Sequence, residues 1–155
     1  MNRRDQIILN PREQAELLDS ERVVVISSIG PRGWPHSMPM WFLAIEGEIW
    51  IWTYAKSQKV KNLERDPRAT LLVESGHKYQ EVRGIQIEAE AELIRDTDRV
   101  FEFAKKLALR YADGIDALGD DAAEALRMQA PKRVAIRFEA VRVATWDHRK
   151  LGGTY

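Results

Sequence analysis

The side chains best suited to binding a ligand lie in a short basic segment, residues 54–61. Lys56 and Lys59 flank Ser57, whose hydroxyl suits the N-cap position at the start of a helix. The first turn of a helix has free backbone N–H groups and the positive end of the helix dipole, which together attract an anion. The segment therefore predicts a phosphate-binding turn. The alternative is an ordinary solvated helix start.

The local charge supports an anion site without deciding between these two interpretations. The stretch from residue 56 to residue 68 holds five cations and two anions, whereas the whole chain balances 24 basic against 24 acidic residues. The five cations are Lys56, Lys59, Lys61, Arg65 and Arg68, and the anions are Glu64 and Asp66. Helix starts with basic neighbours often bind only water, so both interpretations stay open.

The elements on either side of this turn follow from the spacing of apolar residues. The preceding residues alternate with the period of a β-strand. One face of that strand carries Trp50, Trp52 and Tyr54, and the other carries Ile49, Ile51 and Thr53. After the turn, Val60 and Leu63 begin the apolar stripe of a short helix that ends before Pro67. The sequence thus predicts a strand, a basic turn and a helix in direct succession.

Most of the remaining chain is predicted as strands with short connections. The expected strands are residues 22–29, 36–45, 49–55, 69–74, 85–93 and 133–146. Six antiparallel strands favour a closed or nearly closed barrel of Greek-key-like connectivity, because closure removes exposed edges. The 85–93 strand has one apolar face and one glutamate-rich face. In the last strand the apolar phase shifts near Glu139 or Ala140, which indicates a β-bulge.

Helices are expected to flank this barrel. Asn10 to Ser20 reads as an opening helix with Pro11 in its first turn. Asp96 to Ala112 has the helical period, with apolar residues at 100, 103, 104, 107, 108 and 111. Residues 113–128 are expected to form a loop with a second short helix. The fold class is therefore mainly β with flanking helices.

Composition limits the function classes. We interpret residues 1–155 as one domain, and 45% hydrophobic with 31% charged residues describes a soluble globular protein. Zero net charge argues against a dedicated nucleic-acid or membrane-surface binder. The absence of cysteine excludes disulfides, thiolate metal sites and cysteine nucleophiles. No apolar stretch approaches a membrane span, so we expect a cytoplasmic protein.

Known catalytic motifs are missing from the sequence. There is no GxGxxG after a strand and no GxSxG elbow. His36, His77 and His148 lie far apart without paired-ligand spacing, so no metal site is predicted. Carboxylate pairs such as Glu88 and Glu90 fit a solvated or interfacial row better than an acid–base pair. No side chain is assigned a catalytic role.

Three segments together resemble a known family. WPHSMPMWF, IWTYAKSQKVKNLERDPRATLLVE and IQIEAEAEL are similar to the flavin-binding split-barrel family of pyridoxamine 5′-phosphate oxidase. The resemblance covers residues 21–93 and implies a six-stranded antiparallel split β-barrel. It also implies a homodimer with two sites between subunits. The cofactor phosphate would lie at Thr53, Lys56, Ser57 and Lys59, and the flavin ring beside Pro39, Met40 and Trp41.

Within that family the chain more closely resembles the flavin/deazaflavin oxidoreductase branch. FMN-binding oxidases usually place an arginine directly before the lysine that matches Lys59, whereas this chain has Gln58. The resemblance therefore favours coenzyme F-420, a deazaflavin, over FMN. It implies hydride transfer to a small organic substrate, in which the cofactor supplies the chemistry. The alternatives are an FMN-binding oxidase-like protein and a non-enzymatic module that holds flavin or haem.

Overall fold

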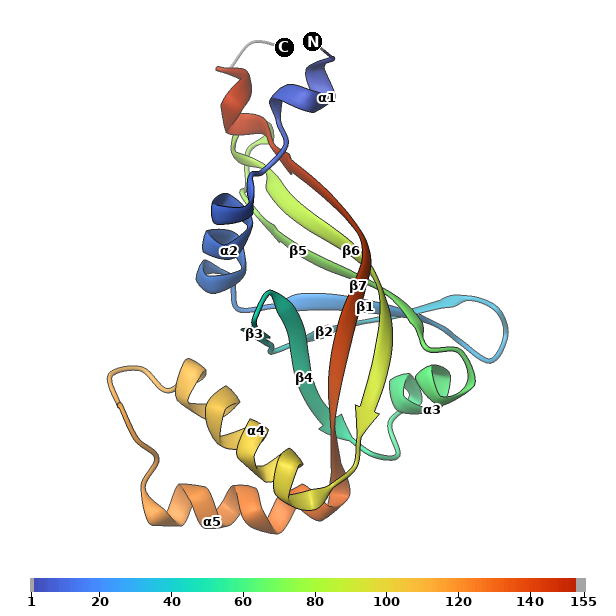
Figure 1. Ribbon diagram of the computed structural model, residues 1–155, viewed down its shortest axis with the longest axis vertical. Helices are drawn as coiled ribbons and strands as arrows, with labels where there is room; N and C mark the ends of the chain where they lie inside the picture. Colours follow the sequence, from blue (N-terminus) through green and yellow to red (C-terminus); the bar gives the residue numbers. More distant parts are fainter. Residues whose placement is uncertain (1, 153–155) are drawn as a thin grey trace.

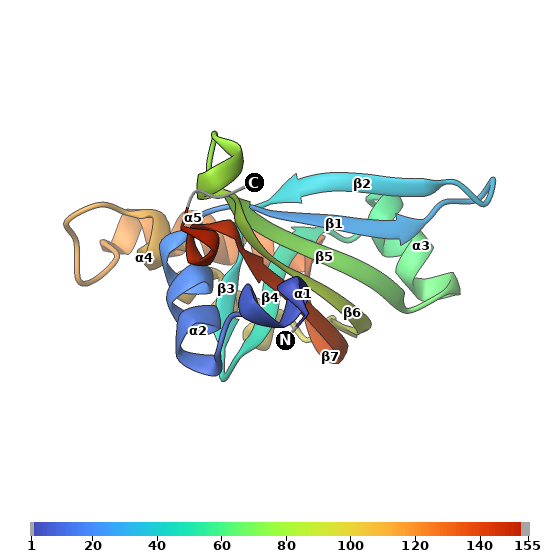
Figure 2. The same ribbon diagram turned by 90° about the horizontal axis from the view of Figure 1, so that it is seen from above.

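The computed structural model of this chain describes residues 2–152 and is built on one antiparallel sheet of seven strands (Figure 1). The order across the sheet is β2-β1-β5-β6-β7-β4-β3. The strands are β1 (Val24–Ile29), β2 (Pro35–Met40), β3 (Leu43–Ile45), β4 (Glu48–Tyr54), β5 (Arg68–Ser75), β6 (Arg83–Ile94) and β7 (Arg133–Asp147). Figure 2 shows the strands from above, curving into a half-barrel. The mainly-β antiparallel prediction is confirmed.

The predicted count of six strands is wrong, because the expected strand at residues 36–45 is broken at Trp41 and Phe42. Its two parts, β2 and β3, lie at opposite edges of the sheet. The chain therefore crosses from one edge to the other within two residues, and this crossing draws the two edges of the sheet together. Met40, Phe42 and Ala44 pack in the same hydrophobic cluster, so the period of two continues across the break. The sequence pattern consequently gives no sign of the break.

Five α-helices and three short 3-10 helices surround the sheet within residues 2–152. The α-helices are α1 (Arg3–Gln6), α2 (Pro11–Ser20), α3 (Gln58–Arg65), α4 (Thr97–Tyr111) and α5 (Asp120–Gln129). The 3-10 helices are η1 (Tyr79–Glu81), η2 (Ala130–Lys132) and η3 (His148–Leu151). The predictions of α2 to α5 are confirmed, whereas α1 was not expected. None of these helices combines the length and apolar character needed to cross a bilayer.

Two hydrophobic clusters stabilise the fold. The larger one fills the concave side of the sheet with buried side chains such as Ile26, Ile51 and Ile136. The smaller one lies between the sheet and α4, where Trp50 packs against Phe103 with their ring centroids 5.7 Å apart. The two faces of β4 thus serve different cores, since Ile49 and Ile51 face the first, and Trp50 and Trp52 the second.

The longest strands confirm the predicted alternation and the predicted bulge. In β6, Ile85 and Ile87 are buried while the neighbouring glutamates are exposed. Glu88 pairs with Arg142 and Ala89 with Ala140, so Val141 of β7 is the extra residue of a β-bulge. The bulge lies next to the predicted positions. It turns Val141 to the surface, where 68% of the residue is exposed.

Gly84→Ala is expected to destabilise the fold. A Cβ at this position would lie 2.3 Å from Cζ2 of Trp146, which is the residue paired with Gly84 across β6 and β7. Relieving such an overlap should lower the free energy of unfolding by about 1 to 3 kcal/mol in a urea titration. Gly119→Ala is the control for the overlap, since a Cβ there has no neighbour within 4 Å, and it should lose only the smaller N-cap preference of glycine at the start of α5. Equal losses for both variants would contradict this account of the packing.

Candidate functional site

The turn between β4 and α3 has an unpartnered polar atom at its centre. Ser57 takes the N-cap position of α3, yet its side chain makes no capping hydrogen bond. Its Oγ is buried and has no hydrogen-bond partner within the described residues 2–152. The first turn of α3 also contains no acidic residue. A buried hydroxyl, free helix N–H groups and the absence of negative charge together suit an anionic ligand.

Lys59 supplies a buried positive charge beside this turn. The residue is only 7% exposed, and its Nζ donates a hydrogen bond to Oγ1 of Thr53 at 3.1 Å. No carboxylate of residues 2–152 lies within ion-pair distance of Lys59. Removal of the ammonium group from water lowers the pKa of Lys59 below the usual lysine range. An anion bound at the turn would offset this cost by pairing with the charge.

A chain of polar contacts fixes α3 against β1. The Asn62 side chain is fully buried, and its Nδ2 donates to Oγ of Ser28 at 3.1 Å. Gln58 Nε2 in turn donates to Oδ1 of Asn62 at 2.8 Å. Near the end of the helix, Arg65 donates to the backbone carbonyl of Ile29. The sequence prediction missed Asn62 and Ser28; the only available signal was a polar residue between the apolar positions 60 and 63.

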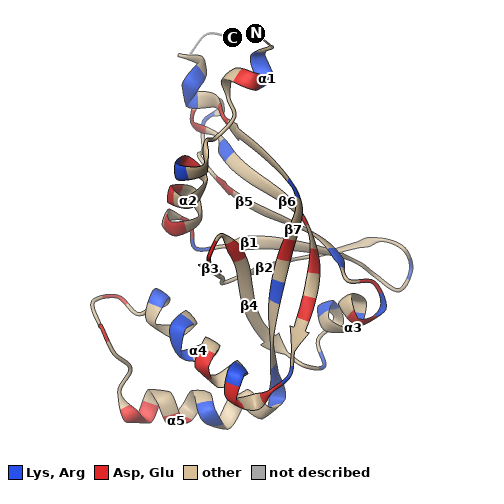
Figure 3. Cartoon of the chain, viewed as in Figure 1, with Lys and Arg blue, Asp and Glu red and all other residues tan. Residues whose placement is uncertain are grey.

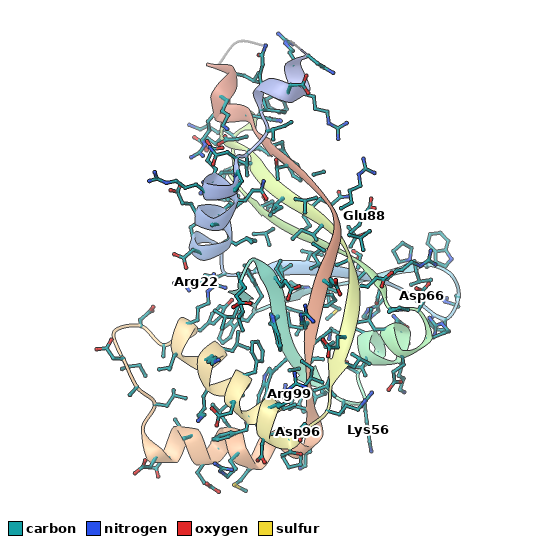
Figure 4. The ribbon with its side chains drawn as sticks, in the orientation of Figure 1. Arg22, Lys56, Asp66, Glu88, Asp96 and Arg99 are labelled. Atoms are coloured by element: carbon teal, nitrogen blue, oxygen red, sulfur yellow. The ribbon has the colours of Figure 1, made fainter. Side chains whose placement is uncertain are left out.

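The structure brings together part of the predicted phosphate set. Thr53 and Lys59 are in contact, and Ser57 lies in the turn between them in the chain. Lys56 is exposed and points away from the molecule (Figure 4). Its charge is therefore available to a ligand from the solvent side only.

The predicted ring-binding residues lie on a separate element. Pro39 and Met40 end the edge strand β2, and Trp41 begins the crossing to β3. Pro39 is exposed, Met40 half-buried, and Trp41 59% exposed. Trp41 stacks on Tyr111 of α4, with ring centroids 4.3 Å apart and an angle of 10° between the planes. An exposed aromatic surface at a sheet edge can receive a planar ligand.

Other candidate residues have structural roles or lie elsewhere. Trp50 and Trp52 pack in the α4 cluster, and the Arg133 guanidinium lies 4.6 Å from the Trp52 ring centroid. The described residues 2–152 contain no group of three His, Asp or Glu side chains that could hold a metal ion. A cleft of about 430 Å³ on the outer face of the sheet, lined by Ser27, Thr70 and Val141 among others, contains none of the predicted site residues.

A family model described as pyridoxamine 5′-phosphate oxidase matches residues 11–147, which is most of the chain. The chain belongs to the pyridoxamine 5′-phosphate oxidase family. This confirms the resemblance found in the sequence. A comparison with curated proteins gives no match.

Several solved structures share the fold of this chain. A conserved hypothetical protein from Mycobacterium tuberculosis is 36% identical, with a TM-score of 0.89, and the alignment covers 100% of this chain and 95% of that protein. An F420 reductase aligns with a TM-score of 0.63 at 20% identity, over 83% of this chain and 93% of the reductase. A haem storage protein from Vibrio cholerae aligns with a TM-score of 0.68 at 11% identity, over 90% of this chain and 98% of its own. The last two show a shared fold alone.

The turn before α3 fits the phosphate of the coenzymes that this oxidase family binds. Members of the family bind flavins, whose phosphate group offers several acceptor oxygens. Such oxygens could accept from the buried Ser57 hydroxyl, from Lys59 Nζ and from the first N–H groups of α3. The group would thus provide the partners that Ser57 and Lys59 lack within the described chain.

Titration of Lys59 should appear in the stability of the ligand-free protein. The pKa of Lys59 is lower in the folded chain than in the unfolded chain, so between these two values the unfolded state binds more protons. The free energy of unfolding should therefore rise with pH across that alkaline range. Lys59→Met should lack this rise and should be at least as stable as wild type at neutral pH. Urea titrations over a pH series measure both effects.

The control for this prediction is Lys106→Met, which removes the same charge from an exposed position of α4. It should keep the rise of stability with pH, because Lys59 is still present. If Lys59→Met showed the wild-type rise with pH, the buried ammonium would not be the source of the effect.

Proposed function

We propose that this protein is an oxidoreductase that uses a flavin-type coenzyme to transfer hydride to a small organic substrate. The observation that carries the proposal is the basic turn before α3. Among the described residues 2–152, this turn holds a buried lysine without a counter-ion and a buried serine hydroxyl without a hydrogen-bond partner. Polar groups left in this state are costly unless a ligand completes them, which favours a phosphate-bearing coenzyme.

The charge of the turn favours the deazaflavin coenzyme F-420 over FMN. FMN ends in a phosphate monoester with a charge near −2 at neutral pH, whereas the phosphate of coenzyme F-420 is a diester with one negative charge. Lys59 is the single buried cation of the turn, and the neighbouring Gln58 is neutral and bonded to Asn62. One buried cation matches one negative charge, while a second cation would suit the monoester better.

The residues around the proposed site would position the coenzyme and leave the chemistry to it. Ser57, Lys59 and Thr53 would hold the phosphate, with Lys56 contributing from the solvent side. Backbone groups of Pro39 to Trp41 would line the edge of the ring and determine which face meets the substrate. The reduced coenzyme would supply a hydride to the substrate and would itself be oxidised, so no catalytic base is required of the protein.

We also propose a homodimer with its two sites at the subunit interface. The outer face of the sheet presents apolar side chains to solvent, since Val141 is 68% and Ile29 is 39% exposed. Acidic and basic residues lie along the same strands (Figure 3), and Oε1 of Glu88 lies 3.7 Å from Nη1 of Arg142. An apolar face with a charged surround is typical of an interface with a second subunit. The cytoplasmic location stays a prediction.

Lys59→Ala should weaken coenzyme binding about ten- to a hundredfold, because it removes a charge-assisted contact worth about 1.5 to 3 kcal/mol. Titration with coenzyme F-420 and with FMN, followed by tryptophan quenching, measures the change. Lys56→Ala should have a smaller effect, since that side chain is exposed and screened. Added salt should weaken wild-type binding and reduce the difference between the variants.

Lys106→Ala on α4 is the matched control and should bind like wild type. Equal affinities of wild type and Lys59→Ala at low salt would contradict the proposal that the turn before α3 binds the phosphate. Tighter binding of FMN than of coenzyme F-420 would reject the deazaflavin preference alone. Binding without any reoxidation of the reduced coenzyme by added electron acceptors would favour a non-enzymatic module that holds flavin or haem.

Light scattering at micromolar concentration should give twice the chain mass of 17.9 kDa. Val141→Asp should shift the protein toward the monomer, because it places a charge on the apolar outer face, and should weaken coenzyme binding at the same time. Ile115→Asp is the control, as Ile115 is 47% exposed but lies between α4 and α5. A monomeric wild type at these concentrations would refute the shared-site proposal.

A further inference from the structure

The exposed ring of Trp41 rests on a residue seventy positions later in the chain. Tyr111, the last residue of α4, stacks on Trp41 at 4.3 Å with the two rings nearly parallel. One face of the indole is covered by this contact, while 59% of the residue remains accessible. Trp41 is therefore an exposed aromatic surface with a fixed support, rather than a free side chain at a strand end.

The hydroxyl of Tyr111 holds the backbone next to Trp41. It accepts a hydrogen bond from the Phe42 N–H at 2.9 Å. Its own hydrogen is directed to the carbonyl oxygens of Arg22 at 2.7 Å and Phe42 at 3.0 Å. Because these backbone groups of Phe42 lie at the crossing between β2 and β3, Tyr111 provides hydrogen bonds that a neighbouring strand would otherwise provide.

Arg110 extends the same connection to the start of the chain. Its guanidinium donates to the carbonyl oxygen of Phe42, and also to those of Leu18 at 2.7 Å and Glu21 at 2.8 Å. The last two carbonyls belong to the C-terminal end of α2, where a positive charge is favoured. The end of α4 is thereby joined to α2, to Arg22 just before β1 and to the crossing. This network restricts the movement of Tyr111, on whose ring Trp41 rests.

We propose that Tyr111 is a positioning residue that holds Trp41 as a wall of the coenzyme-ring site. This inference rests on the proposed function, because that function places a tricyclic ring beside Pro39, Met40 and Trp41. Tyr111 acts from both sides of Trp41, through its ring on the indole and through its hydroxyl on the following residue. Neither contact needs Tyr111 to touch the coenzyme.

Tyr111 is not a proton donor in this arrangement. Its single hydroxyl hydrogen is directed to backbone carbonyls, and its oxygen also accepts the Phe42 N–H. A substrate would have to break these bonds to receive the proton. The contribution of Tyr111 to binding is therefore expected to pass through Trp41 alone.

A double-mutant cycle on coenzyme affinity tests whether Tyr111 affects binding through Trp41. Tyr111→Phe keeps the ring and removes the hydroxyl, and should weaken binding of coenzyme F-420 about three- to tenfold. Trp41→Leu removes the wall and should weaken binding about tenfold. If Tyr111 acts through Trp41, the double variant should bind no more weakly than Trp41→Leu. The dissociation constants come from quenching of the coenzyme's own fluorescence, and thermal unfolding confirms that each variant is folded.

Tyr79→Phe is the matched control, since Tyr79 also contacts a ring, that of His148 at 4.6 Å, but belongs to η1. It should leave coenzyme affinity unchanged. If Tyr111→Phe did not fold, Arg110→Lys would replace it, because it keeps the charge but loses the forked donor set that reaches the Phe42 carbonyl. Its loss of affinity should likewise vanish in the Trp41→Leu background.

The outcomes separate this inference from the proposed function. If wild type binds the coenzyme tightly and Tyr111→Phe has the same dissociation constant, the role of Tyr111 is overturned but the proposed function is not. Losses that multiply in the double variant would also overturn it, because Tyr111 would then act independently of Trp41. No binding of coenzyme F-420 or FMN by wild type would overturn both.

Discussion

The crossing of the chain at Trp41 and Phe42 is the constraint on which the rest of this structure depends. The two edge strands of the sheet, β2 and β3, are separated by only these residues, so the sheet has to curl until its edges approach. A crossing of this kind removes backbone groups from strand pairing. Tyr111 and Arg110 provide the missing partners, and Phe42 is fully buried beneath them. Closure of the half-barrel and the end of α4 are therefore parts of one arrangement.

A second constraint lies at the turn before α3, where residues that favour anion binding lower the stability of the ligand-free protein. A core that included a methionine in place of Lys59 would avoid the cost of a buried ammonium group. The chain instead keeps this charge, with one hydrogen bond to Thr53 and a lowered pKa. It also keeps the buried hydroxyl of Ser57, which has no hydrogen-bond partner in the described part of the chain. Both features raise the free energy of the ligand-free fold and lower that of a complex with an anion.

Much of the fold could be predicted because its strongest signals are local. The alternation of β6, the helical period of α4 and the bulge in β7 each arise from residues that are neighbours in the chain. The break between β2 and β3 could not be found in this way, since Phe42 keeps the alternation of the residues before it. Its cause is a set of contacts from α4 some seventy residues away. The bond between Asn62 and Ser28 was missed for the same reason.

The two halves of the candidate site also differ in whether they depend on local or on long-range contacts. The anion half is contiguous, because β4, its turn and the start of α3 place Thr53, Ser57 and Lys59 together by local geometry. The ring half depends on the whole topology, since Trp41 has its position only where α4 meets the crossing. A change in α4 can therefore alter the ring half while the anion half stays intact. Under the proposed function, affinity for the phosphate and selection among planar rings would therefore depend on separate parts of the fold.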